Sequence, residues 1–248
     1  MSGHSKWSTI KRAKGASDAK RAKIFTKIGR ELAVAARAGG ANPDDNPALR
    51  MAVTKARAAN MPKDTIKRAI EKATAESGGE NWESVRYEAY GPGGVALLID
   101  ALTDNRNRTV AEVRSRLTKA GGNMGETGSV GWIFEQKGQI VVDIGQGVDA
   151  DEVALAMIDV GAEDVQVEEG FIEIVTAPTD LEAVRAALEE AGTAIGSAEV
   201  EMRPTNTVAL DESRGRVMLH LIEALEDLDD VQKVYSNADF PDSVLVEA

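Results

Sequence analysis

The chain has 248 residues, of which 43% are apolar and 4% aromatic, and it contains no cysteine. Its length is sufficient for two or three domains with packed cores, and the lack of cysteine excludes disulfides, thiolate nucleophiles and the common cysteine-based zinc sites. The formal net charge of -12 is unevenly divided, because residues 1–75 carry 17 lysines and arginines against 6 acidic residues and the remainder carries 12 against 35. A segment of +11 beside one of -23 is typical of a basic nucleic-acid-binding region joined to an acidic body, although ordinary solvated helix faces are the alternative.

The first 16 residues form a polar, basic arm. They lack the apolar core of about 7 to 15 residues that a secretory signal requires, and apolar runs in the chain, such as Val95–Ile99, are short. We therefore expect a soluble, cytoplasmic protein. Clustered cations favour binding to a phosphate backbone, and a tryptophan among them could stack on a base. The candidate contacts in and just after the arm are Lys6, Trp7, Lys11, Arg12, Lys14, Lys20, Arg21, Lys23 and Lys27.

The segment from Ser17 to Gly40 predicts a long amphipathic helix. The apolar residues at helical spacing are Ile24, Ile28, Leu32, Ala35 and Ala36. The cations that recur on another face are Lys20, Lys23, Lys27, Arg30 and Arg37. The helix therefore has a core side and a cationic side, and Arg30 joins the candidate nucleic-acid contacts.

Two shorter helices complete a predicted three-helix domain. Asn46–Pro47, a cap residue followed by a first-turn proline, indicates the start of the first. The second begins near Pro62. Their inward apolar residues are Leu49, Val53, Ala56, Ile66, Ala69, Ile70 and Ala73. The glycine-bearing stretch Ser77–Asn81 indicates a linker, so we assign residues 1–77 to a basic arm and helical domain.

Beyond the linker, the apolar period changes from helical to strand-like. The expected elements are a strand through 85–89, a turn at 91–94, a strand at 95–102, a helix from about 106 that stops at Gly121, and a strand at 130–135. After the next segment, a strand at 207–210, a helix at 211–228 and a strand at 231–235 would complete the same domain. We assign this discontinuous α+β domain to residues 82–136 plus 205–248.

Residues 137–204 predict a second α+β domain, inserted into the first. The expected order is strand 139–144, helix 150–160, strand 164–168, strand 171–176, helix 180–191 and strand 198–202. This βαββαβ order is the ferredoxin-like signature. Thr179 and Glu182 predict a capping box for the second helix. The fold class is thus a multidomain α+β protein, with a three-helix domain followed by two α+β domains.

Few residues suit catalysis. A serine nucleophile needs a neighbouring base, and His220 is the only histidine beyond the arm. The glycine cluster Gly121–Gly128 lacks the lysine and hydroxyl ending of a nucleotide-binding P-loop and is expected to be a turn. We predict that the chain is not an enzyme and uses no cofactor or metal.

Two further charged segments allow a functional and a structural interpretation. Within Thr103–Thr109, backbone N–H groups with Arg106 and Arg108 could bind an anion at a helix N-terminus. Asp104 or Asn105 could equally cap that helix. The spacing of the acidic run Glu223–Asp230 fits neither an EF-hand nor an octahedral cation site, and the run predicts a solvated helix face.

Several segments closely resemble the YebC/PmpR family, whose eukaryotic relatives are mitochondrial translational activators. The matching segments, in order over nearly the whole chain, are Gly3–Trp7, Asp18–Arg21, Phe25–Lys27, Asn60–Lys63, Tyr90–Gly94, Thr103–Thr109, Gly121–Asn123 and Val234–Asp239. The resemblance implies a three-domain cytoplasmic protein without cofactor or catalysis. Bacterial members are described as probable transcriptional regulators that bind DNA, and others look like ribosome-associated translation factors that relieve stalling at proline-rich stretches.

The sequence therefore predicts a nucleic-acid-binding regulator of gene expression. A DNA-binding transcriptional regulator is the first hypothesis, and a translation factor on ribosomal RNA is the alternative, because phosphate attraction serves both. The acidic body is expected to orient the molecule or to contact transcription or ribosomal proteins. No membrane partner is expected.

Overall fold

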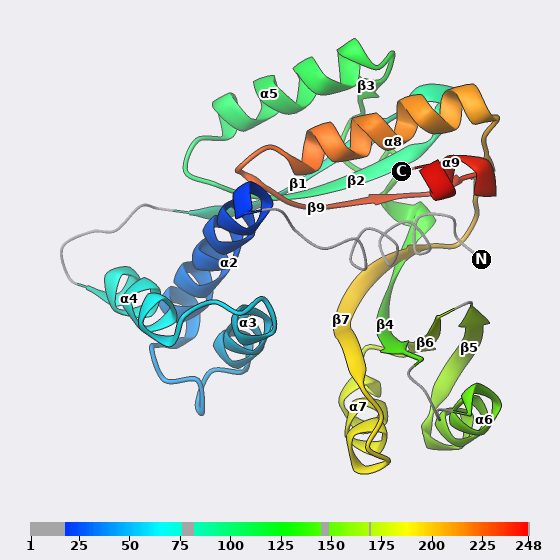
Figure 1. Cartoon of the computed structure of the whole chain (residues 1–248). Coiled ribbons are helices and arrows are strands. Elements are labelled where there is room, and N and C mark those ends of the chain that lie inside the picture. The colour runs from blue at the N-terminus through cyan, green and yellow to red at the C-terminus, as the bar shows by residue number, and fades with distance from the viewer. Residues whose placement is uncertain (1–17, 76–81, 145–148, 169, 248) are drawn as a thin grey trace. The chain divides into compact units, whose positions relative to one another are not determined.

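A computed structural model of the chain describes residues 18–75, 82–144, 149–168 and 170–247 (Figure 1). The chain separates into two compact units, one formed by Met1–Gly131 with Thr207–Ala248 and the other by Trp132–Asn206. The first unit contains a helical region and an α+β sheet domain, and the second is another α+β sheet domain. The predicted fold class is confirmed.

The helical region consists of α2 (Asp18–Gly39), α3 (Pro47–Ala58) and α4 (Lys63–Thr74). Its core contains the predicted apolar stripes, with Leu32, Leu49 and Ala56 fully buried. Ile24 is the exception, because it lies in the first turns of α2 and is 39% exposed. The buried Asn46 caps α3 by accepting the N–H of Leu49 at 3.1 Å, and its amide donates to the carbonyl of Ala35 at 2.8 Å. One asparagine thus fixes the start of α3 against α2, so the packing of the two helices follows from a cap that the sequence predicts.

The sheet domain of the first unit has strand order β3-β1-β2-β9, and every pairing is antiparallel. Its strands are β1 (Glu83–Tyr90), β2 (Ala96–Thr103), β3 (Asn123–Met124) and β9 (Val231–Ser236). Helices α5 (Arg106–Lys119) and α8 (Glu212–Glu226) lie side by side along the sheet (Figure 1). Residues of both helices and of β1, β2 and β9 share one apolar core, which positions the start of α5 and the end of α8 near each other.

The C-terminal part of this domain differs in detail from the expectation. β9 joins β2 as predicted, but the predicted strand 207–210 is the short β8 (Val208–Ala209), which pairs in parallel with β10 (Ala238–Asp239) in a separate two-stranded sheet. The Val208 N–H donates to the carbonyl of Asn237, just beyond β9, so β8 finds its partner past the end of the larger sheet. A terminal helix, α9 (Asp242–Glu247), was not predicted.

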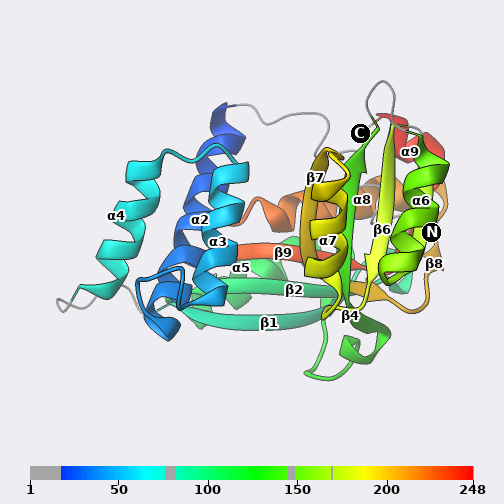
Figure 2. The same ribbon diagram turned by 90° about the horizontal axis from the view of Figure 1, so that it is seen from below.

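The second unit has the predicted βαββαβ order. Its elements are β4 (Phe134–Asp143), α6 (Ala150–Val160), β5 (Ala162–Glu168), β6 (Phe171–Thr176), α7 (Leu181–Glu190) and β7 (Ile195–Pro204). The sheet order β5-β6-β4-β7 with antiparallel pairing is the ferredoxin-like arrangement. Figure 2 shows α6 and α7 side by side on one face of this sheet, and the face beneath them is fully buried at Ile140, Ile172 and Ile174.

Two local predictions for this unit are wrong. The strands expected at 130–135 and 139–144 are replaced by one strand, β4, because β7 pairs with it continuously from Phe134 to Val142. A short 3-10 turn, Gly131–Ile133, precedes it. The capping box is also absent, since Asp180 rather than Thr179 flanks α7 and makes no side-chain cap, while the Thr179 hydroxyl lies 3.2 Å from the Asp180 carboxylate.

Candidate nucleic-acid interface

The predicted nucleic-acid contacts are distributed over three parts of the chain. Lys6, Trp7, Lys11, Arg12 and Lys14 lie outside the described residues, and Lys20 belongs to α2 but its side chain also lies outside them. The others are placed on two helices. On α2 these are Arg21, Lys23, Lys27 and Arg30, and at the start of α5 they are Arg106 and Arg108.

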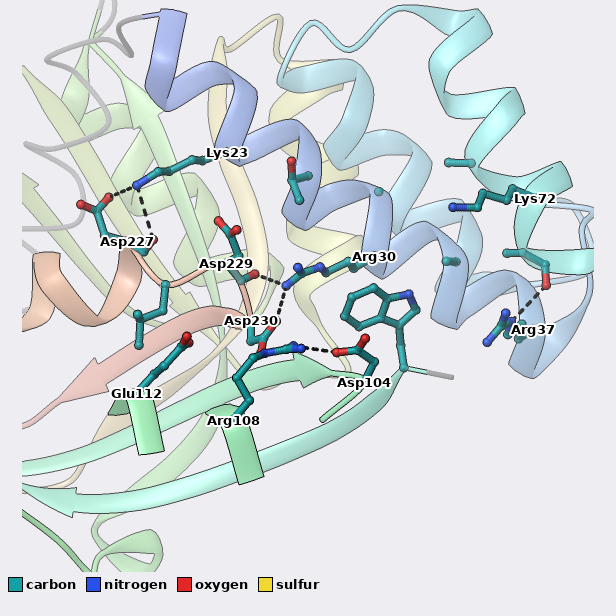
Figure 3. A pocket seen from close by; sticks show the side chains of 17 residues that line it. Lys23, Arg30, Arg37, Lys72, Asp104, Arg108, Glu112, Asp227, Asp229 and Asp230 are labelled. Carbon is teal, nitrogen blue, oxygen red and sulfur yellow. Dashed lines mark hydrogen bonds and ion pairs between the residues drawn. The ribbon is translucent and has the colours of Figure 1, made fainter. Parts of the chain in front are cut away.

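Three cations of α2 contact the end of α8, about 200 residues away in the sequence. Lys23 Nζ lies 3.0 Å from Asp227 Oδ1, and Lys27 Nζ donates to the carbonyl oxygen of Glu226 at 2.5 Å. Arg30 donates to the carbonyl of Asp229 and, at 2.9 Å, to Asp230 Oδ1 (Figure 3). The cationic face that the sequence predicts is therefore real, but in this structure it faces an acidic segment of the same chain.

The Arg30 contact is the most shielded of the three. The side chains of Arg30 and Asp230 are 13% and 4% exposed, compared with 44% and 66% for Lys23 and Asp227. The Arg30 guanidinium also lies over the indole ring of Trp82, 4.4 Å from its centroid. A stacked and partly desolvated arginine pair interacts more strongly than an exposed lysine pair, so Arg30 anchors this contact.

Asp230 is the point where α2, α5 and β9 meet. Its Oδ2 accepts from Arg108 Nη2 at 2.8 Å and lies 2.7 Å from Thr109 Oγ1 and 3.2 Å from Thr103 Oγ1. Burial by itself would raise the pKa of Asp230, but the hydrogen bonds from Arg108 and Thr109 and the positive charges of Arg108 and Arg30 outweigh it and lower the pKa. The carboxylate is therefore ionised and fully partnered.

The prediction that Glu223–Asp230 is a solvated face is thus wrong for its last residue. Asp230 is buried because it lies just before β9, at the edge where the end of β2 and the start of α5 converge. The signal that could have indicated this contact is an acidic residue directly before a predicted strand, in a chain that also has a helix with a cationic face.

For the segment Thr103–Thr109, the structure shows the helix cap that was one of its two interpretations. Asn105 caps the helix by accepting the Arg108 N–H at 3.1 Å. Arg106 pairs with Glu83 at 2.7 Å, and Arg108 also contacts Asp104 at 2.6 Å. Both arginines are thus paired with acids of the chain, and their contact with nucleic acid stays a prediction.

A cavity of about 840 Å³ adjoins these contacts. Charged residues of both signs line it (Figure 3): Lys23, Arg30, Arg37, Lys72, Arg108, Asp104, Glu112, Asp227, Asp229 and Asp230. Five cations and five carboxylates balance each other, so the cavity wall has no excess positive charge to attract a phosphate.

The glycine cluster 121–128 belongs to a loop that encloses a carboxylate of the chain. Glu88 accepts backbone N–H bonds from Gly128 at 2.7 Å, Val130 at 2.6 Å and Gly131 at 2.8 Å. Burial would raise the pKa of Glu88, but these three bonds outweigh it and lower the pKa. Gly122 lies so close to β1 that a Cβ would be 2.5 Å from the carbonyl oxygen of Tyr90. The loop is therefore a structural turn, in agreement with the sequence, and three of its N–H groups already donate to Glu88.

We expect Glu88→Gln to lower the free energy of unfolding by about 2 kcal/mol at pH 7, because the neutral amide is a weaker acceptor and turns an NH2 group towards backbone donors. The folded pKa of Glu88 lies below its unfolded value, so the stabilisation is present above about pH 4.3 and is lost as the pH falls through the folded pKa. Urea unfolding at pH 7 and pH 3 measures both effects. Glu83→Gln, an exposed acid on the same strand, is the control and should change stability by less than about 0.5 kcal/mol.

His220 is the one histidine among the described residues. His220 is exposed, and its Nδ1 lies 2.8 Å from the carbonyl oxygen of Arg216 one turn earlier in α8. Within the described ranges, no three metal-ligating side chains are grouped together. None of the described helices combines the length and apolarity needed to cross a membrane.

The fold and these contacts define the class of protein: a basic helical region followed by two α+β sheet domains, with the cationic helix face in contact with an acidic segment. The chain belongs to the TACO1/YebC family. Residues 5–76 match the model of the TACO1/YebC N-terminal domain, and residues 82–238 match that of the second and third domains.

Close relatives and a solved structure agree with this assignment. A probable transcriptional regulatory protein of Moorella thermoacetica is 53% identical over 248 residues, covering 99% of this chain and 98% of the relative. Another of that name from Dehalococcoides mccartyi strain CBDB1 is 52% identical over 245 residues, covering 99% and 97%. The crystal structure of a conserved hypothetical protein, Aq1575, from Aquifex aeolicus has a TM-score of 0.82 at 47% identity and covers 90% of this chain and 92% of that one.

Proposed function

We propose that this chain is a cytoplasmic, DNA-binding transcriptional regulator without catalytic activity, and that its basic N-terminal third attaches to duplex phosphates. The observation that carries the proposal is the division of charge, +11 in residues 1–75 against -23 in the remainder. Relatives more than 50% identical over the full chain bear the name probable transcriptional regulatory protein, which supports the same function.

The charge of the ferredoxin-like unit restricts where DNA can bind. Residues 132–206 contain 3 lysines and arginines against 17 acidic residues, a net charge of -14. Phosphates are repelled by such a surface. The helical region, in contrast, exposes further cations beside the predicted set, at Arg57 on α3 and at Lys63 and Arg68 on α4. DNA therefore approaches the helical region, and the acidic unit remains available for protein partners.

Crosslinking in living cells, followed by sequencing of the bound DNA and RNA together, tests the proposed function. We expect enrichment of promoter DNA by the wild-type chain and its loss in a variant with Lys11→Gln and Lys14→Gln. The matched control neutralises Lys119 on α5 and Arg185 on α7, which removes the same amount of charge from the acidic part of the chain and should leave the enrichment unchanged. Enrichment of ribosomal RNA in place of promoter DNA would contradict a transcriptional role and favour the ribosome-associated alternative.

A further inference from the structure

We propose that the segment Glu226–Asp230, here called the acidic latch, is an autoinhibitory contact that occupies the cationic face of α2 and must release it before that face binds nucleic acid. The inference rests on the proposed function and adds a regulatory step to it. Nucleic acid and the acidic latch compete for the same three side chains, Lys23, Lys27 and Arg30.

The latch offers these cations the same chemistry as a nucleic-acid backbone. The three cations lie at i, i+4 and i+7 on one face of α2, and each contacts an oxygen of the latch. Two of the acceptors are carboxylates, and three are backbone carbonyls, those of Glu226 at the C-terminal end of α8 and of Asp227 and Asp229 just beyond it. The two carboxylates and the carbonyl oxygens near the negative end of the helix dipole form a row of acceptors with negative potential, as phosphates do.

The sequence of the latch is costly for α8 itself, which indicates that it has another role. Four of the five latch residues are acidic, and the last turn of α8 contains no basic residue. Acidic side chains at a helix C-terminus are opposed by the dipole, which favours cations there. The contact with Lys23, Lys27 and Arg30 compensates for this arrangement, and departures from local preference are expected at functional sites.

Asp230 remains partnered when α2 leaves. Arg30 contacts only Oδ1, whereas Arg108 and the hydroxyls of Thr103 and Thr109 surround Oδ2. Release of α2 therefore leaves no buried carboxylate without a donor, which removes the largest penalty for breaking a shielded ion pair. The Lys23–Asp227 pair is exposed on both sides and opens more readily.

Affinity for a 20-base-pair duplex, measured by fluorescence anisotropy at low salt, tests the competition. Asp227→Asn removes one latch contact at an exposed position, and we expect duplex binding to tighten about two- to fivefold, the range that an exposed ion pair contributes. Glu212→Gln is the matched control, because it removes an equal charge from the other end of α8, where Glu212 pairs with Arg216 at 2.6 Å. It should leave the affinity unchanged. If both variants tighten duplex binding equally, the change in affinity comes from net charge alone, and the proposed latch is overturned.

Distance measurement tests the release directly. Because the chain contains no cysteine, Met51→Cys on α3 and His220→Cys on α8 give two unique positions for spin labels, and both residues are exposed. In double electron–electron resonance, saturating duplex should lengthen the distance distribution between the labels. A distribution that is unchanged while the duplex is bound would overturn the latch and leave the proposed function intact. If neither the wild-type chain nor Asp227→Asn binds the duplex, the proposed function is overturned, and the latch with it.

Discussion

The affinity of this chain for duplex DNA is expected to fall roughly a thousandfold or more between about 50 and 200 mM salt. If six to eight cations of the predicted set neutralise phosphates, the slope of log affinity against log salt is about -5 to -7, because each neutralised phosphate releases condensed counterions. No sequence-reading helix is required for this effect, since the phosphate backbone is the same in every duplex.

The same salt titration also measures how many phosphate contacts the lysines of the arm make. Lys11→Gln combined with Lys14→Gln should reduce the slope by about one for each lysine that contacts phosphate. Lys119→Gln with Arg185→Gln removes the same charge from the acidic part and should not alter the slope. A slope near zero in the wild-type chain would contradict phosphate binding by the basic N-terminal third.

Replacement of Asp230 by alanine is expected to lower the free energy of unfolding by about 3 kcal/mol, the range for removing one partner of a buried ion pair. The substitution leaves the shielded guanidinium of Arg30 without its carboxylate and takes one hydrogen-bond partner from each of the buried hydroxyls of Thr103 and Thr109. Urea unfolding at pH 7 measures the loss. Asp229→Ala is the control, because the Asp229 side chain is exposed and Arg30 contacts only its backbone carbonyl.

The pH dependence of that loss has a definite sign. The pKa of Asp230 is lower in the folded chain than in the unfolded one, so its stabilisation is complete above the unfolded value of about 3.9 and disappears as the pH falls through the folded pKa. The difference between wild type and Asp230→Ala should therefore be constant from about pH 5 to 7 and shrink towards pH 2. A difference that persists unchanged at acid pH would show that the effect comes from lost packing and not from the charge.

Regulation by the acidic latch changes how the charge division is understood. The -23 of the body includes a few acids that contact the cations of α2 directly, while the ferredoxin-like unit contains most of the remainder. A chain that keeps part of its cationic face covered binds nucleic acid less tightly than its composition suggests. That difference is a source of selectivity, because only a polyanion that engages the arm and α2 together displaces the latch.

The helices and strands were largely predictable because they depend on local patterns. The stripe of Ile28, Leu32 and Ala36 has the helical period, the Asn46–Pro47 pair has cap chemistry, and the order of elements in residues 137–204 indicates a ferredoxin-like sheet without knowledge of any contact. The continuity of β4 was missed because nothing local marks it: the strand extends to Phe134 since Pro204 and its neighbours on β7 pair with it.

By itself, the sequence determined the fold class, the family resemblance and the presence of a cationic face on α2, since periodicity and charge are properties of neighbouring residues. Only the tertiary structure decided what that face contacts. Arg30 and Asp230 are 200 residues apart, and their pairing depends on β9 returning to β2 and on α2 packing near the end of α8. Ion pairs at such separation follow from the packing of cores, and no spacing of residues along the chain encodes them.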